Sequence, residues 1–207
     1  YFKSIEGISI PLAAILLFTF PIFVNLGAFF FLKETLNKKQ ILSLILACAG
    51  LVILLWGPII INSLQAAIYA LLAALTYSVY VLVSGHFQKN VPPLSSSVYI
   101  ISSAGIALAI FNHQELIPIS EISTKQSLII LGIALISTIA PMTLFLAGLQ
   151  KLSSSQASII VMIEPVAAAV LAWGLFSETL TATQLTGAIL VIIALFINAR
   201  SNTSTSS

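Results

Sequence analysis

Long apolar runs separated by short polar breaks make up nearly the whole chain. Each run has about 20 residues, the length that an α-helix needs to cross the hydrocarbon core of a membrane. Backbone groups in lipid need partners inside the protein, so runs this long and this continuously apolar predict helices rather than barrel strands. Seven membrane-spanning helices are predicted, at residues 9–32, 39–56, 63–85, 94–111, 127–149, 153–176 and 182–199.

Composition supports an all-α membrane protein and removes other classes. Hydrophobic residues make up 59% of the 207 residues and charged residues 7%, whereas soluble domains carry roughly a quarter charged residues. The net charge of +2 is too small and too scattered for a nucleic-acid partner. Cys48 is the only cysteine and lies inside the second span, so we expect no disulfide within the chain, no metal site and no cofactor.

Basic residues fall mainly on one side of the predicted helices. If the connection 33–38 faces the cytoplasm, only Lys3 and Lys125 lie outside. The rule that cytoplasmic loops are rich in Lys and Arg then places the C-terminus in the cytoplasm, with residues 201–207 as a disordered tail. The basic residues on the cytoplasmic side are Lys33, Lys38, Lys39, Lys89, Lys151 and Arg200.

An internal repeat appears when the chain is shifted by 144 positions. The shift places Pro21 over Pro165 and the triplet Glu34-Thr35-Leu36 over Glu178-Thr179-Leu180, without a gap. The matched helices are five spans apart, and an odd number of spans means that the two copies cross the membrane in opposite directions. Inverted repeats of this kind are typical of secondary transporters, whose substrate site lies between the copies.

The repeat sets the expected domain organisation. Each copy would have five helices, so residues 57–200 form a complete second copy and residues 1–56 the last two helices of the first. We therefore expect ten helices in the whole protein, seven of them present here, and about three more upstream.

In each copy, the connection between the two matched helices contains an acid, followed by a capping box that opens the second helix. Asn37 with Gln40, and Thr181 with Gln184, read as capping boxes that open the next helix. Glu34 and Glu178 lie at the preceding helix end, where the helix dipole disfavours an anion. We expect each carboxylate to turn onto the free N–H groups of the next helix and fix the corner; the alternative is a direct part in transport.

At these residues the chain resembles the drug/metabolite transporter superfamily, EamA-type branch. The pattern Pro-x12-Glu-Thr-Leu followed by Gln, seen twice, is similar to that family's repeat signature, and the likeness extends from Tyr1 to Arg200. The resemblance implies ten helices, both termini in the cytoplasm, and transport of small metabolites across a bacterial inner (cytoplasmic) membrane. It also makes residues 1–5 similar to the end of a third helix, in agreement with an N-terminal truncation.

Glu164 is the strongest candidate for a functional residue. It lies 11 residues from Ser153 and 12 from Phe176, near the middle of the bilayer, where a charge costs about 2.5–3.5 kcal/mol on insertion scales. Its counterpart in the first copy is Phe20, so the repeat itself does not require the acid. We predict that Glu164 faces a central cavity as a proton-coupling or amine-binding group; the alternative is a protonated carboxyl that donates to the carbonyl left free by Pro165.

Other mid-span residues are weaker candidates. Pro21, Pro141 and Pro165 fall within helices and should bend them. Asn25 could line the cavity or bond to a neighbouring helix, and Trp173 could stack on a substrate or anchor the chain at the interface. Further candidates for the cavity wall are Tyr77, Tyr80 and Thr138.

The predicted function is a secondary transporter, an exporter of small metabolites or amino-acid-like compounds that works by alternating access. A small-molecule substrate, the lipid bilayer and protons are the expected partners, and the oligomeric state stays open. A membrane enzyme is disfavoured because neither His86 nor His113 lies in mid-span and no nucleophile motif is present. A seven-helix retinal protein would need a lysine in the last span, which has none; a channel of the same architecture remains an alternative.

Overall fold

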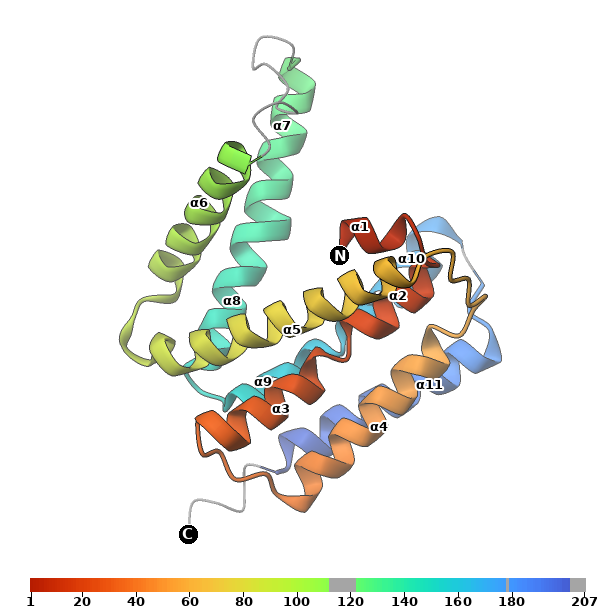
Figure 1. The fold of residues 1–207 in the computed structure, drawn as a ribbon. Helices are drawn as coiled ribbons and strands as arrows, with labels where there is room; N and C mark the ends of the chain where they lie inside the picture. The colour runs from red at the N-terminus through yellow and green to blue at the C-terminus, as the bar shows by residue number, and fades with distance from the viewer. Residues whose placement is uncertain (112–121, 178, 202–207) are drawn as a thin grey trace. The chain divides into compact units, whose positions relative to one another are not determined.

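The computed structural model describes residues 1–111, 122–177 and 179–201, and these residues are almost entirely helical (Figure 1). Among them, the one isolated β-bridge joins Ile8 to Ile61. The segment η1 is a 3-10 helix and η4 is a π-helix. In chain order the helical segments are α1 (Phe2–Ile5), α2 (Ile10–Leu17), α3 (Phe20–Phe31), α4 (Lys38–Leu54), α5 (Leu64–Phe87), η1 (Gln88–Asn90), α6 (Pro93–Phe111), α7 (Thr124–Gly132), η4 (Ile133–Ile139), α8 (Ala140–Leu149), α9 (Ser154–Val161), α10 (Glu164–Phe176) and α11 (Ala182–Ala199).

Six helical stretches of the described chain are long and apolar enough to cross a membrane, so the protein is an all-α membrane protein. The one predicted span that is not among these six, residues 39–56, corresponds to α4, which has 17 residues. At 1.5 Å per residue it is about 25 Å long, at the lower limit for a membrane helix. The six stretches are Ile10–Phe31, Leu64–Asn90, Pro93–Phe111, Thr124–Leu149, Ser154–Phe176 and Ala182–Ala199.

Contacts divide the chain into two compact units. The first contains Tyr1–Val83 and the residues from Ser153 onward, and the second contains Ser84–Leu152. Within the second unit, α6 and α8 are joined by a hydrogen bond between the hydroxyls of Ser97 and Thr143 (2.7 Å). The Gln150 amide donates to the carbonyls of Gln88 (3.1 Å) and Val91 (2.9 Å), which fixes the start of this unit to its end.

In the first unit, α4 and α11 run antiparallel (Figure 1). Asn37 at the start of α4 donates through Nδ2 to the carbonyl of Ser201, just beyond the end of α11 (3.2 Å). At the other end, the backbone of Leu54 packs against Gly187, in the second turn of α11. The connection 32–37 and the connection that ends at Thr181 therefore lie at opposite ends of this helix pair, as an inverted repeat requires.

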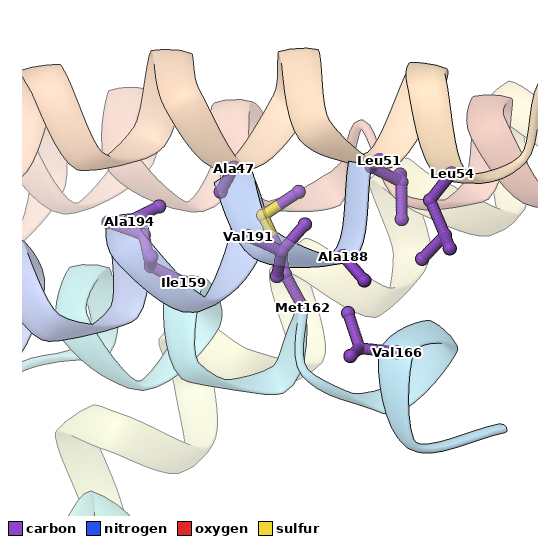
Figure 2. Packing of buried hydrophobic residues seen from close by; sticks show 9 residues of the cluster. All are labelled: Ala47, Leu51, Leu54, Ile159, Met162, Val166, Ala188, Val191 and Ala194. Carbon is purple, nitrogen blue, oxygen red and sulfur yellow. The ribbon is translucent and has the colours of Figure 1, made fainter. Parts of the chain in front are cut away.

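Small residues allow the two helices to pack closely. A Cβ on Gly50 would lie 2.8 Å from the carbonyl oxygen of Gly187, so only glycine fits at this point of the contact. Around it, α4 and α11 bury a cluster of apolar side chains together with residues of α9 and α10 (Figure 2). The cluster consists of Ala47, Leu51, Leu54, Ile159, Met162, Val166, Ala188, Val191 and Ala194.

The backbone repeats with the same 144-residue offset as the sequence. Helix α2 and helix α9 match at both ends, and α3 and α10 begin at matching positions, Phe20 and Glu164. Lys33 and Ser177, again 144 apart, both adopt left-handed backbone geometry (φ 55° and 56°). Non-glycine residues pay about 1–2 kcal/mol for that conformation, so its occurrence at both positions reflects the same tight exit from the preceding helix.

The starts of α4 and α11, which match at this offset, have the same chemistry, whereas α9 has a capping box that its counterpart α2 lacks. Asn37 with Gln40, Thr181 with Gln184, and Ser153 with Gln156 all form complete capping boxes. A fourth box, Ser123 with Gln126, opens α7. Glu178 and His113 lie outside the described residues.

Candidate functional site

A cavity of about 670 Å³ lies within the first unit. Residues of three helical regions line it: the junction between α2 and α3, the middle of α5, and the junction between α9 and α10. Both junctions are helix breaks that interrupt a membrane span. The lining residues are Tyr1, Leu17, Phe18, Phe20, Ala73, Thr76, Tyr77, Tyr80, Val161 and Glu164.

Proline produces both breaks. Pro21 and Pro165 lack the N–H group that would bond to the carbonyl four residues earlier, and these carbonyls belong to Leu17 and Val161. In each of the two spans, one helix therefore ends, a short turn follows, and the next helix begins at Phe20 or Glu164. Leu17 and Val161 both line the cavity, so residues at matching positions of the two breaks border the same space.

Pro141 acts on the second unit in a related way. The segment before it, η4, is a π-helix, and α8 then begins at Ala140. Thr138 donates its hydroxyl to the carbonyl of Ile133 (3.3 Å), five residues earlier. Its hydroxyl is therefore bonded to its own helix, which is the usual alternative to a role in a cavity wall.

Glu164 is the only carboxylate among the cavity-lining residues. It occupies the first position of α10, where the helix dipole favours a negative charge. Its side chain is exposed, and it forms no hydrogen bond to any residue that the structure describes.

Aromatic rings form the wall near Glu164. Phe20, its counterpart in the first copy, packs edge-on against Tyr77 with ring centroids 4.6 Å apart. Tyr77 in turn stacks on Tyr80 at 5.8 Å, with an angle of 27° between the rings. Phe18, Leu17 and Thr76 also line the cavity, although sequence reasoning did not select them. Leu17 could have been found, since it carries the carbonyl that Pro21 leaves without its usual donor.

A smaller cavity of about 430 Å³ adjoins the first along α5. The two share Tyr1, Ala73 and Thr76, and the smaller one extends to Tyr69, whose hydroxyl accepts a hydrogen bond from Gln65 (2.8 Å). The two cavities together therefore extend along α5 towards the start of this helix.

Two predicted residues lie away from the cavity. Asn25 is 3% exposed, and its amide donates to the Pro21 carbonyl (2.7 Å) and to the Ser158 hydroxyl on α9 (3.4 Å). It joins two helices and does not line the cavity. Trp173 is 59% exposed on α10 and does not line the cavity either.

Glu34 contacts a different helix from the expected one. Its carboxylate accepts hydrogen bonds from the backbone N–H groups of Ser154 (3.0 Å) and Ser155 (3.3 Å) and from the Ser155 hydroxyl (2.7 Å). These residues open α9, whereas the expectation was α4. The reason is tertiary: α3 packs against α9, and the end of α3 lies beside the start of α9.

Polar residues continue around Glu34 and form one end of the first unit, called here the Asn37 end. Gln156 donates to the hydroxyl of Ser201 (3.2 Å), and Asn198 donates to the carbonyl of Gln156 (3.1 Å). Ser201 is 1% exposed, so the expected disordered tail cannot begin at this residue; residues 202–207 lie outside the described part. Ser201 is held because the side chains of Asn37 and Gln156, at the starts of α4 and α9, donate hydrogen bonds to it.

Comparison with protein families gives a match over nearly the whole chain. The family model of the EamA-like transporter family matches residues 1–56 and 64–200. Three curated relatives are similar at low identity. An uncharacterized transporter of Archaeoglobus fulgidus is 24% identical over 95% of this chain and 70% of its own length.

The other two relatives match over comparable stretches. The uncharacterized transporter YoaV of Bacillus subtilis is 25% identical over 89% of this chain, and an uncharacterized transporter of Clostridium kluyveri is 27% identical over 92%. The chain spans 65% and 63% of their lengths. A known crystal structure has the same fold, with a TM-score of 0.80 over the whole of this chain and 73% of that one, at 16% identity.

Proposed function

The chain belongs to the EamA-like transporter family, and we propose that this membrane transporter is a secondary transporter that moves small amine-bearing metabolites by alternating access. The observation that carries the proposal is the meeting of two proline-broken helices at one cavity. The breaks come from matching positions in the two copies, and one copy contributes an acid, Glu164, where the other has Phe20. Broken helices beside a mid-membrane site are typical of transporters that contain inverted repeats.

The chemistry of the cavity wall supports a substrate with an ammonium group, such as an amino-acid-like compound. A carboxylate pairs with a cation, and the faces of Tyr77 and Tyr80 attract one as well. An acid that forms no hydrogen bond within the described residues is also available to a proton. Glu164 would therefore bind the substrate amine and a coupling proton in turn.

Topology and domain organisation are part of the proposal. Lys33, Lys38, Lys39 and Arg200 all belong to the Asn37 end, which favours a cytoplasmic location for that end and for the C-terminus. The membrane would be a bacterial inner membrane. Residues 1–56 would be the last two helices of one five-helix copy, and residues 57–200 the whole of the second.

Uptake by proteoliposomes that contain the intact protein tests the function. A panel of radiolabelled amines and amino acids is offered with and without a pH gradient, to wild type, Glu164→Gln and the control Glu6→Gln. Glu6 is an exposed acid outside the cavity. We expect saturable uptake that the gradient stimulates, and we expect Glu164→Gln to lose the stimulation and about tenfold or more in rate, equivalent to roughly 1.4 kcal/mol.

Two results would count against this proposal. Unchanged uptake and an unchanged response to the gradient in Glu164→Gln would remove the acid from the mechanism. A channel would conduct without acceleration by unlabelled substrate on the opposite side, whereas a carrier exchanges faster under that condition. Vesicles loaded with labelled substrate test the proposed direction, export from the cytoplasmic side.

A further inference from the structure

The Glu34 carboxylate completes the cap of α9. The first two N–H groups of this helix bond to Glu34, and the third bonds to the Ser153 hydroxyl (3.2 Å). A helix start normally leaves these groups to a capping residue and water. Here a side chain from a distant helix, α3, takes two of them.

Among the described residues, no acid bonds to the first N–H groups of α4, α7 or α11. The starts of α4, α7 and α11 also have capping boxes. Within the described residues, their first two N–H groups have no acceptor outside the box. The fold of a helix start therefore does not require Glu34, and its contact with α9 has to be understood as a connection between helices.

The connection joins the two copies of the repeat. Glu34 belongs to the first copy (1–56), and Ser154 and Ser155 belong to the second (57–200). Both serines are almost fully buried, at 2% and 0% exposure. Helix α3 runs about 17 Å at the helical rise from Phe20 in the cavity wall to Phe31, and Glu34 lies just beyond its end. The contact thus closes the Asn37 end at a distance from the cavity.

The sequence offers such a donor set at one end only. The positions that match Ser154 and Ser155 in the first copy are Ile10 and Pro11, which have no hydroxyl, and proline has no N–H either. Instead, backbone hydrogen bonds hold the segment before α2: Ser9 donates to the Ile60 carbonyl (3.0 Å), and Asn62 donates to the Gly7 carbonyl (2.9 Å).

We propose that Glu34 holds the Asn37 end closed and that its bonds to Ser154 and Ser155 break when this end opens during transport. The inference rests on the proposed function, because only alternating access requires the two copies to separate at one end. Glu34 is therefore a residue that sets the balance between the open and closed states, and it touches no substrate. Its removal shifts that balance towards the state that is open at the Asn37 end.

Chemical accessibility of a buried position measures the opening. In the intact protein without native cysteines (Cys48→Ala in this chain), Ser158→Cys places a thiol one turn inside α9, at a fully buried site. A membrane-impermeant maleimide reports how often that site becomes exposed. We expect Glu34→Gln and Glu34→Ala to raise the modification rate about tenfold, the factor for a loss of roughly 1.4 kcal/mol.

Three controls separate opening from general loosening. Ala70→Cys places the thiol in another fully buried site, in the cluster of Ile8, Ala13 and Ala66, and its rate should stay unchanged. Glu6→Gln removes an acid without affecting either site. Ser155→Ala removes only the hydroxyl donor, so it should give a smaller increase, and it should add little to Glu34→Gln because both act on one contact.

The labelling rates distinguish a contact that holds the Asn37 end closed from a purely structural cap. An unchanged rate at position 158 in both Glu34 variants, or an equal rise at positions 158 and 70, would overturn the proposal and leave Glu34 as a structural cap. Should Glu34→Ala fold poorly, Glu34→Gln alone decides. Labelling requires no substrate, so a wild type that transports nothing would refute the proposed function without affecting this result.

Discussion

Replacement of Gly187 by alanine tests the close contact between α4 and α11. The new Cβ would lie 2.6 Å from the carbonyl oxygen of Gly50 and 2.7 Å from the Cα of Leu54, whereas ordinary contacts begin at 3.4 Å. Both neighbours are backbone atoms of a helix and cannot rotate away. The backbone nitrogen of Leu54 lies closer still, so the two helices must separate by at least about 0.8 Å along the contact.

The cost follows from the dispersion energy across the contact. About 40 atom pairs at roughly 0.15 kcal/mol each give about 6 kcal/mol, and a gap of 0.5–1 Å loses a quarter to a half of it, or about 1.5–3 kcal/mol. The higher helix propensity of alanine returns about 1 kcal/mol. We therefore expect Gly187→Ala to destabilise the protein by about 0.5–2 kcal/mol.

Gly174 on α10 provides the matched control because a Cβ there would meet nothing within 4 Å. Gly174→Ala should be neutral or stabilising by up to about 1 kcal/mol, so the two variants should differ by about 1.5–3 kcal/mol. At roughly 2–4 °C per kcal/mol for a chain of this size, their melting temperatures should differ by about 3–12 °C. Thermal unfolding of the purified intact protein in detergent, at one scan rate, measures the difference. Equal melting temperatures would refute the close packing described here.

Two further predictions concern the helix junctions. Pro165→Ala restores the N–H that can bond to the Val161 carbonyl, so the melting temperature should stay level or rise while the turnover of uptake falls several-fold; undiminished turnover would argue against a role of the break in transport. Asn25→Ala removes the bonds to Pro21 and Ser158, and it should cost about 1 kcal/mol of stability with KM unchanged; a raised KM at full stability would return Asn25 to the cavity wall.

Features that depend on residues close in sequence were predictable. Apolar run length set the helices, and the i, i+3 pairing of Asn37 with Gln40 and of Thr181 with Gln184 marked where two of them begin. The position of a proline marked each helix break. Each of these features is determined by residues within one continuous stretch of the chain, and the capping boxes and helix breaks by residues within about one turn.

Features that depend on the packing of distant segments were not predictable from this sequence alone. The acid at Glu34 was recognised as a capping group, but the helix that it caps is 120 residues away, and no local pattern names that partner. The ordered Ser201 has the same origin, since Asn37 and Gln156 hold it from two other helices. Trp173 was a candidate because it follows Glu164 on the same span, yet only the rotation of α10 decides which direction its ring faces.

Comparison of the two copies separates structural requirements from functional ones. Positions that agree at the 144-residue offset, such as Pro21 with Pro165, satisfy backbone needs that both copies share: a helix break, a left-handed exit and a capped start. Where the copies differ, the backbone imposes no requirement. Phe20 is replaced by Glu164 at the cavity, and Pro11 by Ser155 at the contact with Glu34. The first difference supplies a charge at the proposed substrate site and the second supplies donors at one end only, so a few residues introduce an asymmetry between two copies that share the same backbone pattern.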